Sequence, residues 1–598
     1  MNSNLNFTFC NVIINNPKKG KKMGKKQLLF MLIFFLVVSL LVACDDSSDS
    51  GTSNVNSTET VEDINEVEDE DLSDIAAIAD YEDHDDLEDY TWDSSEIILI
   101  ALEGSSITIA GEGATIDGST IVITSAGTFS ISGNLDDGQI IVDTDDKEIV
   151  RLILNSVVIS SSTSAPIHVM NAEKTMIVLA DNTENYITDG ESYADEEEAN
   201  AAIYSEDDLT IYGEGSLIVE GQFADGITSK DGLIITSGTI NISAEDDGIR
   251  GKDYLVVKGG NITVTASGDG LKSDNDEDSS KGYISIEDGT LKITSDGDAI
   301  QAATDILIAG GEIELSSGGG SNNIIDESTS AKGIKAAAYI TIDNGTIDID
   351  AADDAIHSNG SLTINNGDIT LASGDDAIHA DYDLIINDGT IDITDSYEGI
   401  ESAGGDITID NGEIHIVSSD DGLNLADSDN YLYINGGYIA IDSTGDGIDA
   451  NGSIIMTDGV VVVNGPSASN NSALDYDGSF KMNYGFLVAS GSSRMAEAPG
   501  TSSSQYSILL NFNSTLQADT LVHIETSDGE DVLTFAPTNS YQSIAFSSTE
   551  LENGETYNVY YGGSSTGTVT DGLYEGGTYT SGTKYTDFTI SSIVTTVN

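Results

Sequence analysis

Cysteine, proline and basic side chains are all scarce in this chain of 598 residues. Cys10 and Cys44 are the only cysteines and both lie in the first 44 residues, so a mature chain without that leader has no disulfide and no thiol chemistry. Five prolines are present, and the middle of the chain shows no sustained 3.6-residue periodicity, which argues against solenoids built from helices. The 21 Lys and Arg residues face 104 Asp and Glu residues, a net charge of −83, and this excludes nucleic acid as a partner.

The N-terminus is the one strongly basic and apolar part of the chain. Six lysines between Lys18 and Lys26 precede an apolar run from Leu28 to Val42, and Ala43 and Cys44 follow. This pattern predicts a bacterial lipoprotein signal over residues 1–44, with acylation at Cys44 and a place on the extracellular face of the cell membrane. A plain secretory signal with a chance cysteine is the alternative, and Met23 could be the true start. Removal of the leader takes away six basic and no acidic residues, so the mature charge becomes 15 minus 104, or −89.

A triplet of residues recurs eleven times through the middle of the chain: an acidic or polar residue, then Gly or Ala, then Ile or Leu. Successive triplets start 22, 22, 29, 34, 22, 22, 22, 23, 25 and 26 residues apart, and a fixed period in this range indicates stacked repeats. The triplets begin at Asp225, Asp247, Asp269, Asp298, Lys332, Asp354, Asp376, Glu398, Asp421, Asp446 and Ser472.

Apolar residues within a repeat alternate with polar ones and are interrupted by Asn-Gly or Asp-Gly, which predicts three short strands and turns. The fold class is therefore all-β, a parallel β-helix of about 22 residues per turn, and we expect right-handed coiling. We expect an acidic, Ser-rich tether over residues 45–95, the β-helix over 96–484 and a β-rich C-terminal cap over 485–598. The turn glycines are expected to need positive φ angles: Gly238, Gly259, Gly260, Gly289, Gly310, Gly311, Gly345, Gly367, Gly389, Gly412, Gly436, Gly437 and Gly459.

Stacking turns the first residue of each triplet into a column of carboxylates, which we call the acidic column. Like charges about 5 Å apart repel one another. Bound calcium, which takes 6 to 8 oxygen ligands, commonly neutralises such a group of carboxylates. The alternative is that Asp before Gly serves the turn and the remaining acids are solvated. The densest predicted calcium cluster comprises Asp246, Asp247 and Asp269 with the inserted loop residues Asp274, Asp276 and Asp278. The further candidate ligands are Asp225, Asp298, Asp354 and Asp376.

The residue after each triplet forms a second column, the mixed column, whose sign changes from basic to acidic along the chain. Its members are Thr228, Arg250, Lys272, Gln301, Lys335, His357, His379, Glu401, Asn424, Asp449 and Asp475. The scarce cations predict contacts to an anionic ligand bridged by calcium, and simple ion pairing with neighbouring aspartates is the alternative. The two histidines should stack in adjacent turns; a zinc pair is a further alternative, although the sequence shows no other soft ligand.

Tyrosines open the strand after the triplet in five repeats, and their rings could stack on sugar faces or simply reflect β-propensity. These are Tyr254, Tyr283, Tyr339, Tyr382 and Tyr431. The first interpretation would make the tyrosines and the columns parts of one carbohydrate-binding surface. Its candidate residues are Lys230, Arg250, Lys252, Lys272, Lys335, His357, His379, Tyr254 and Tyr339.

Three stretches, 225–230, 246–253 and 268–276, carry a resemblance to the bacterial carbohydrate-binding β-helix family first recognised in cellulolytic clostridia. The similarity extends from about Trp92 to Asn598 and includes residues 163–166 and 495–499. It implies a right-handed parallel β-helix like that of pectate lyases, bound calcium, and binding of cellulose and acidic pectin-type polysaccharide without established catalysis. Lys332 replaces the acid of the family pattern, which leaves calcium open at that turn.

The sequence thus favours a calcium-containing surface lipoprotein, expected to be monomeric, that binds acidic polysaccharide, cellulose or both. A calcium-dependent polysaccharide lyase is the second hypothesis, with Lys252 or Lys272 as the base that takes the proton next to the uronate carboxylate. A structural adhesin without glycan affinity is the third.

Overall fold

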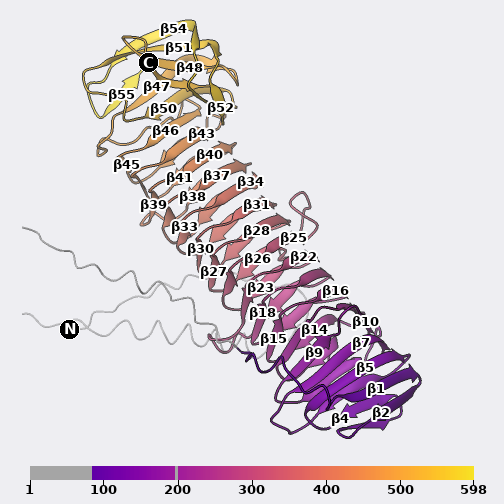
Figure 1. The fold of residues 1–598 in the computed structure, drawn as a ribbon. Helices are drawn as coiled ribbons and strands as arrows, with labels where there is room; N and C mark the ends of the chain where they lie inside the picture. The colour runs from indigo at the N-terminus through magenta and orange to yellow at the C-terminus, as the bar shows by residue number, and fades with distance from the viewer. Residues whose placement is uncertain (1–83, 195–198, 327) are drawn as a thin grey trace, which may run out of the picture. The chain divides into compact units, whose positions relative to one another are not determined.

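Alternating inward and outward side chains build every turn of this fold. In the repeat that contains Ile340 and Ile342, both isoleucines are buried and Thr341 between them is partly exposed, as the period-2 pattern requires. The computed structural model describes residues 84–598 except 195–198 and 327. All regular structure among these residues is β, and the prediction of a parallel β-helix is confirmed: the coil makes about 15 turns (Figure 1).

Each repeat contributes three strands, and equivalent strands of successive repeats pair in parallel to form three stacks. The first stack runs through β14 (Asp225–Ser229), β17 (Ile249–Gly251), β20 (Leu271–Ser273), β23 (Ile300–Ala302), β26 (Ile334–Ala336), β29 (Ile356–Ser358), β32 (Ile378–Ala380), β35 (Ile400–Ser402), β38 (Leu423–Leu425), β41 (Ile448–Ala450) and β44 (Leu474–Tyr476). The second runs through β15 (Gly232–Ile235), β18 (Tyr254–Val257), β21 (Tyr283–Ile286), β24 (Ile306–Ile308), β27 (Tyr339–Ile342), β30 (Ser361–Ile364), β33 (Leu384–Ile386), β36 (Ile407–Ile409), β39 (Tyr431–Ile434), β42 (Ser453–Met456) and β45 (Phe480–Met482). The third runs through β16 (Thr239–Ala244), β19 (Asn261–Ala266), β22 (Thr290–Ser295), β25 (Glu312–Ser317), β28 (Thr346–Ala351), β31 (Asp368–Ser373), β34 (Thr390–Asp395), β37 (Glu413–Ser418), β40 (Tyr438–Ser443), β43 (Val460–Asn464) and β46 (Phe486–Gly491).

The N-terminal turns continue the three stacks with longer strands. Two antiparallel pairs, β1 with β2 and β3 with β4, lie at this end, and the later strands are parallel to their neighbours. The strands are β1 (Ile98–Gly104), β2 (Ser106–Ala110), β3 (Ala114–Asp117), β4 (Thr120–Ile123), β5 (Gly127–Leu135), β6 (Gln139–Asp143), β7 (Val150–Ser160), β8 (Ile167–Asn171), β9 (Thr175–Leu179), β10 (Glu184–Thr188), β11 (Ala201–Ser205), β12 (Leu209–Gly213) and β13 (Ser216–Gly221). The hairpins place the antiparallel strands β2 and β3, rather than a strand of the parallel stacks, at the open end of the coil.

The C-terminal end is closed by mostly antiparallel strands. Strand β50 pairs antiparallel with the last coil strand β46, and a separate six-stranded sheet lies beyond it. A second apolar core joins Val462 and Val488 of the coil to Phe535 and Phe546 of this region. The strands are β47 (Ser507–Leu516), β48 (Val522–Thr526), β49 (Asp531–Phe535), β50 (Tyr541–Ser547), β51 (Thr556–Ser565), β52 (Thr568–Thr570), β53 (Leu573–Glu575), β54 (Tyr579–Thr589) and β55 (Val594–Val597).

The triplet has a steric explanation in the interior of the coil. Its apolar residue, for example Ile249, is fully buried in the continuous core. Its small residue lies against the preceding and following turns: a Cβ on Gly248 would come within 2.3 Å of Val264 Cγ1. Alanine would therefore not fit at Gly248 without a shift of Val264, whereas other turns accommodate the buried alanines Ala299, Ala355 and Ala377 at this position.

The turn glycines follow the expected φ angles with three exceptions. Ten of the thirteen have positive φ, for example +107° at Gly311, where a Cβ would lie 3.0 Å from the carbonyl oxygen of Gly289. Gly259, Gly310 and Gly436 do not. These three each precede a second glycine, and that second glycine makes the left-handed turn, so the expectation was wrong for the first of each pair.

A strap, residues 85–95, packs on the outside of the second stack. Lys174 contacts Asp85 at 2.7 Å, and Arg151 donates two hydrogen bonds to the carbonyl of Asp89. Tyr90 packs edge-on against Tyr212 at 4.8 Å between ring centroids. The last part of the acidic segment is therefore ordered against the coil.

Within residues 84–598, gaps aside, the structure has no helix long and apolar enough to span a membrane. The predicted lipoprotein signal, Cys44 and most of the predicted tether lie outside the described residues.

Candidate functional site: the acidic and mixed columns

The mixed column is a continuous register of side chains on the first strand stack. Every one of its members, from Thr228 to Asp475, pairs with its neighbour in the next turn. Apart from the buried Thr228, each side chain is partly exposed, and from Arg250 to Asp449 it lies between two buried residues. The spacing of the triplets therefore predicted this surface correctly, residue by residue.

The aspartates of the acidic column form a hydrogen-bonded ladder that the sequence did not reveal. The carboxylate of one turn accepts the backbone N–H of the equivalent residue in the next turn. The donor–acceptor pairs are Asp247 to Asp225, Asp269 to Asp247, Asp298 to Asp269, Lys332 to Asp298, Asp376 to Asp354, Asp446 to Asp421 and Ser472 to Asp446. Asp225, Asp247, Asp298 and Asp354 are at most 4% exposed. These carboxylates are structural groups as well as candidate ligands, because they satisfy otherwise unpaired turn amides.

The cations of the mixed column pair with this ladder. Lys272 Nζ lies 3.0 Å from Asp247 and 2.7 Å from Asp269. Arg250 contacts Asp225 at 3.8 Å and forms a close ion pair with Asp274. Ion pairing with neighbouring aspartates, one of the two interpretations open from the sequence, is thus what the structure shows at these residues.

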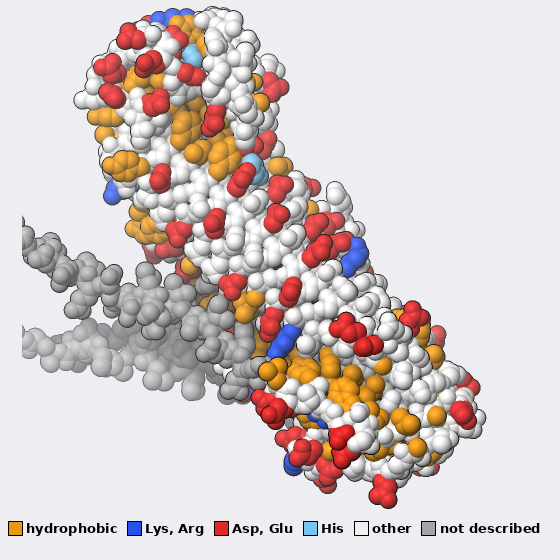
Figure 2. Space-filling view, in the orientation of Figure 1, with side chains coloured by type: hydrophobic (Ala, Val, Ile, Leu, Met, Phe, Trp, Pro, Cys, Tyr) orange, Lys and Arg blue, Asp and Glu red, His pale blue; other side chains and the backbone are white. Residues whose placement is uncertain are grey.

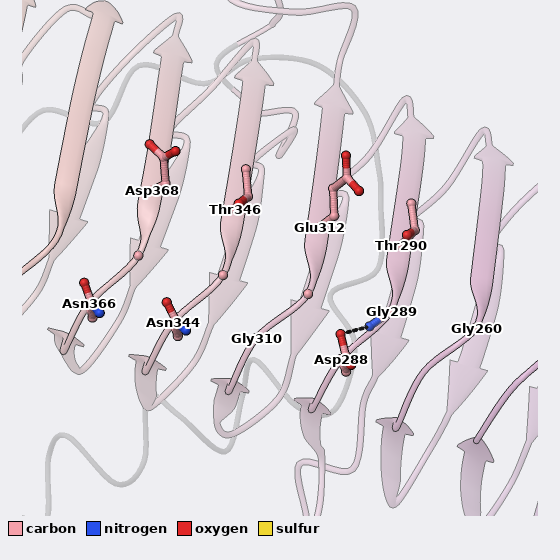
Figure 3. Close-up of a pocket in the computed structure, with 13 residues that line it drawn as sticks. Gly260, Asp288, Gly289, Thr290, Gly310, Glu312, Asn344, Thr346, Asn366 and Asp368 are labelled. Carbon is pink, nitrogen blue, oxygen red and sulfur yellow. Dashed lines mark hydrogen bonds between the residues drawn. The ribbon is translucent and has the colours of Figure 1, made fainter.

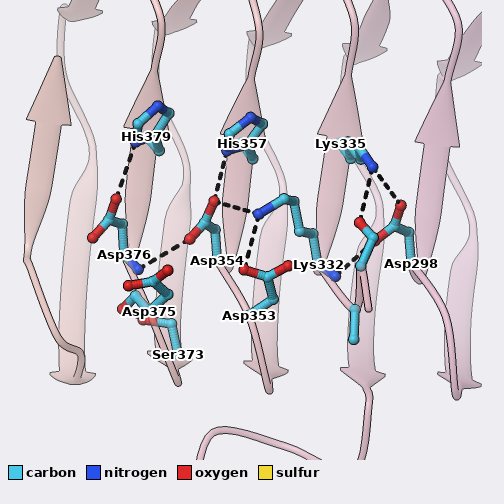
Figure 4. A network of polar contacts seen from close by, with 12 residues as sticks. Asp298, Lys332, Lys335, Asp353, Asp354, His357, Ser373, Asp375, Asp376 and His379 are labelled. Carbon is cyan, nitrogen blue, oxygen red and sulfur yellow. Dashed lines mark hydrogen bonds and ion pairs between the residues drawn. The ribbon is translucent and has the colours of Figure 1, made fainter. Parts of the chain in front are cut away.

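The same pairing continues in the middle of the column (Figure 4). Lys335 lies 3.2 Å from Asp298, and Lys332 lies 2.9 Å from Asp353 and 2.6 Å from Asp354. Burial alone would raise the pKa of Asp354, but the hydrogen bond from His357 and the charge of Lys332 lower it to about 2. Lys332, which replaces an acid in the triplet, therefore neutralises the turn that follows.

The predicted calcium cluster is brought together only in part. Asp225, Asp246 and Asp247 offer carboxylate oxygens that lie within 4.8 Å of one another. Asp269 shares Lys272 with Asp247, as described above, and Asp274 is held by Arg250. Asp276 is exposed in the inserted loop, and Asp278 bonds the nearby Ser280, so no ligand group among the described residues joins the loop to the column.

A second group of carboxylates lies where the mixed column has turned acidic. Asp421, Asp446 and Asp449 offer oxygens within 4.8 Å of one another, and none of them forms an ion pair with a Lys, Arg or His of the described residues. Burial and the charges of Asp421 and Asp475 raise the pKa of Asp446 to about 7 and that of Asp449 to about 6. Sequence reasoning missed this group, although the acidic end of the column was the available signal.

The two histidines stack as predicted. Their rings are 4.6 Å apart and nearly parallel, at 6°. His379 Nδ1 lies 3.0 Å from Asp376 and 2.8 Å from Glu401. Burial would lower the pKa of His379, but these two carboxylates raise it to about 11. The histidines therefore mark the crossover from the basic to the acidic part of the column.

The remaining predicted binding cations lie beside the column. Lys230 lies over the ring of Tyr204, with Nζ 5.9 Å from the ring centroid, and Lys252 is partly exposed between β17 and β18. The pKa of Lys272 is raised by its two aspartates against the opposing effect of burial. A lysine held in its charged form is poorly suited to the role of base that a lyase requires.

The tyrosines divide into a buried and an exposed set. Tyr254 and Tyr283 are 7% and 6% exposed and stack on each other at 5.8 Å, and Tyr254 packs over Gly232. The ring face of Tyr254 is thus covered, which removes it as a sugar platform in this structure. Tyr339 and Tyr382 are 49% and 60% exposed.

The exposed tyrosines border a groove of about 560 Å³ at the corner between the first and second strand stacks. Tyr339, Asn359, Ser361, Tyr382 and Asp406 are among its lining residues. A groove that combines two exposed rings with short polar side chains suits a pyranose chain, whose faces are apolar and whose edges carry hydroxyls.

A second groove of about 680 Å³ follows the corner between the second and third stacks (Figure 3). Glycine backbone forms its floor, and Asp288, Glu312, Asn344 and Asp368 are among the side chains along it. None of the predicted site residues lines it. The face shown in Figure 2 carries many carboxylates and few Lys or Arg side chains, in keeping with the net charge of −83.

These features define a class of protein, a β-solenoid with an acidic face, and comparison with known proteins supplies the family. A family model described as "Carbohydrate-binding domain-containing protein" matches residues 117–377 and 375–529. The chain belongs to this carbohydrate-binding domain family, which confirms the resemblance seen in the sequence.

A curated relative and a solved structure are similar to parts of the chain. A carbohydrate-binding domain-containing protein of Acetivibrio thermocellus is 40% identical over 137 residues, which are 22% of this chain and 48% of that protein. The chain thus matches about half the length of this relative. A solved structure of the polysaccharide lyase-like protein from C. thermocellum, a gadolinium derivative, is 35% identical, with a TM-score of 0.35; the match covers 36% of this chain and 94% of that one.

Proposed function

We propose that this protein binds acidic, pectin-type polysaccharide through calcium on its acidic column, without catalysis, at the cell surface. Membership of a carbohydrate-binding domain family supports carbohydrate binding itself. One observation carries the proposal further: Asp421, Asp446 and Asp449 converge where no described cation pairs with them. An acidic protein with an uncompensated carboxylate group needs a bridging cation to hold an acidic ligand.

The donor set of this group fits calcium. All three side chains offer carboxylate oxygens, the ligands that a hard cation prefers, and no sulfur or imidazole lies in the group. Bound calcium would supply coordination positions, beyond those filled by the protein, to carboxylates of a uronate chain. Asp475, which follows Asp449 in register, extends the group by one turn.

The basic end of the column does not offer an equivalent direct site. Arg250, Lys272 and Lys335 are each engaged by aspartates and are 19%, 24% and 23% exposed. A uronate carboxylate there would have to displace a partner that the fold already holds in place. We therefore assign the acidic end to calcium and ligand, and the basic end to stabilisation of the coil.

The state of Lys272 supports binding without bond cleavage. Two carboxylates within 3.0 Å keep its ammonium charged, whereas proton abstraction next to a uronate carboxylate needs a neutral amine.

We assign neutral sugar rings, such as those of cellulose, to the groove beside Tyr339 and Tyr382. The change Tyr382→Ala removes a ring that is 60% exposed, so the coil should remain intact. It should lower retention on cellulose several-fold, because stacking on an aromatic face is worth about 1 kcal/mol. Tyr484→Ala is the matched control, since Tyr484 is 64% exposed and lies outside the groove. Equal loss in both variants would remove the groove from the proposal.

The proposed location at the cell surface rests on Cys44 and its preceding apolar run. Metabolic labelling with a radioactive fatty acid should mark the protein, and Cys44→Ala should abolish the label while leaving the protein exported. A label that survives this change would place the acyl group elsewhere.

The direct test is co-sedimentation of the purified protein with insoluble polygalacturonate, in calcium and in chelator, with ultraviolet absorbance of unsaturated product recorded in parallel. We expect retention in calcium, release in chelator and no absorbance. Asp446→Asn should weaken retention, and Asp348→Asn, which removes an exposed carboxylate of the third stack, should not. Absorbance that grows with time would make the protein a lyase, and the absence of retention on any glycan would favour an adhesin.

A further inference from the structure

The histidine pair of the mixed column has a geometry that ion pairing alone does not require. Strands β29 and β32 are parallel neighbours, and His357 and His379 are in register. Their rings are stacked, and in Figure 4 both point to the same side of the column, with the same ring edge toward the aspartate of their own turn. The two remaining ring nitrogens, the Nε2 atoms, are therefore neighbours.

The Nδ1 edge of each ring is fixed by buried carboxylates. His357 Nδ1 lies 2.6 Å from Asp354, and His379 Nδ1 lies 3.0 Å from Asp376 and 2.8 Å from Glu401. The side chains of Asp354 and Asp376 are only 5% and 10% exposed. A carboxylate that accepts the Nδ1 proton orients the ring, which is the usual outer support of metal-binding histidines. A metal ion at Nε2 of His379 would take the place of a proton, because the raised pKa given above means that the ring is charged in the absence of metal.

A third ligand lies on the Nε2 side. His379 Nε2 is 3.3 Å from Asp381 Oδ1, and one ring nitrogen of each histidine and an oxygen of Asp381 lie within 4.8 Å of one another. The amide nitrogen of Asn359 lies 3.1 Å from His357 Nε2 and 3.3 Å from Asp381 Oδ2. A group with partial positive charge thus occupies the space between a histidine and the carboxylate, as a cation would.

We propose that His357, His379 and Asp381 form a binding site for a divalent transition-metal ion of the zinc type, separate from the calcium group. Two imidazole nitrogens and one carboxylate oxygen are borderline ligands that suit zinc, nickel or copper and not calcium. Tetrahedral zinc requires about 3.3 Å between two nitrogen ligands. Because an ion lies in the plane of each imidazole that binds it, the two rings, which are nearly parallel at 6°, would turn out of their stack when the ion binds.

The site is accessible and leaves room for a further ligand. The two histidine side chains are 13% and 14% exposed and that of Asp381 is 41% exposed, so an ion can enter from solvent. Three protein ligands leave at least one coordination position for water or for an anionic group of a bound molecule. The proposal does not depend on polysaccharide binding.

The test is isothermal titration of zinc into the purified full-length protein, stripped with chelator and then saturated with calcium to fill carboxylate-only sites. We expect one tightly bound zinc ion that calcium does not displace. Copper in its place should give an electron paramagnetic resonance spectrum with hyperfine coupling to two nitrogens. His357→Gln and Asp381→Asn should each abolish the tight phase, and Asp354→Asn should weaken it by about tenfold or more.

His415→Gln is the matched control, because His415 lies on the third stack away from this group, and it should leave zinc affinity unchanged. Asp381 is a solvent-facing side chain, so its substitution tests the site without disturbing the buried ladder. Tight zinc binding that survives both His357→Gln and Asp381→Asn, or the absence of a tight phase in the unchanged protein, would overturn the proposal.

Discussion

Replacement of Asp446 by asparagine should stabilise the calcium-free protein at alkaline pH. Burial and the charges of Asp421 and Asp475 raise the pKa of Asp446 from 3.8 to about 7. At 1.36 kcal/mol per unit, ionisation of this carboxyl in the fold costs at most about 4 kcal/mol. Its side chain is partly exposed, and solvent screening reduces this to about 2 kcal/mol.

The sign of the pH dependence follows from the direction of the shift. Because the pKa of Asp446 is higher in the folded than in the unfolded state, its contribution to stability is complete below about pH 4 and is lost as the pH rises through about 7. Thermal unfolding in chelator should therefore show a melting temperature that falls from about pH 4 to about pH 7. Calcium, which binds the ionised carboxylates of the fold, should remove most of that fall.

Asparagine keeps the oxygen that accepts the amide of Ser472 but cannot ionise. At pH 8 in chelator, the melting temperature of Asp446→Asn should be roughly 2 °C higher than that of the unchanged protein, as expected for a folded protein of this size. Calcium should raise the melting temperature of the variant by less than it raises that of the unchanged protein. Asp348→Asn should do neither. A variant that melts lower in chelator and keeps the full calcium gain would refute both the repulsion and the assignment of calcium to this group.

Two further predictions test the coil itself, both by thermal or denaturant unfolding. Gly311→Ala should lower the free energy of unfolding by about 1–2 kcal/mol, because φ is +107° at Gly311. Gly310→Ala should lower it by less than about 0.5 kcal/mol. Equal effects would show that the turn does not depend on the residue with positive φ. Lys272→Ala should cost about 2 kcal/mol, because it leaves two mostly buried carboxylates uncompensated. Lys292→Ala is the control, because it removes an ion pair whose side chains are 55% and 60% exposed. It should lower the free energy of unfolding by less than about 1 kcal/mol. A larger loss in Lys292→Ala than in Lys272→Ala would contradict the structural role given to the basic end of the column.

The stacked columns were predictable from sequence because a parallel coil converts spacing directly into register. The 22-residue period placed His357 beside His379 and Arg250 beside Lys272 without any knowledge of side-chain contacts. The period does not say toward which neighbour a side chain points. The ladder of aspartates and backbone amides, and the capture of Arg250 by Asp274, therefore appeared only in the structure.

Charge balance along the column distinguishes the calcium cluster predicted from the sequence from the second group of carboxylates. The sequence analysis placed the ion at the densest run of aspartates, near Asp247, and the structure puts Lys272 between Asp247 and Asp269 there. Whether a group of carboxylates requires a bound metal ion depends on how far the acids outnumber the nearby cations, and not on the density of the acids alone. Around Asp446 no cation of the described residues pairs with the converging acids, and the mixed column itself is acidic there.

The burial of Tyr254 could not be predicted from the sequence, because a tyrosine at the start of a strand can be either buried or exposed. A glycine in the preceding turn, Gly232, leaves the space into which the ring packs, whereas the equivalent ring of Tyr339 remains 49% exposed. Aromatic residues at equivalent positions of a solenoid thus differ in accessibility according to the small residues of the adjacent turn.

Titration of polygalacturonate oligosaccharides into the protein, in calcium and in chelator, tests the central claim most directly. The account predicts heat of binding in calcium, none in chelator, and strong loss of affinity in Asp446→Asn with Asp449→Asn while Asp348→Asn binds normally. Binding that is equally strong in chelator, or that the paired substitution leaves unchanged, would contradict a calcium bridge at the acidic end of the column.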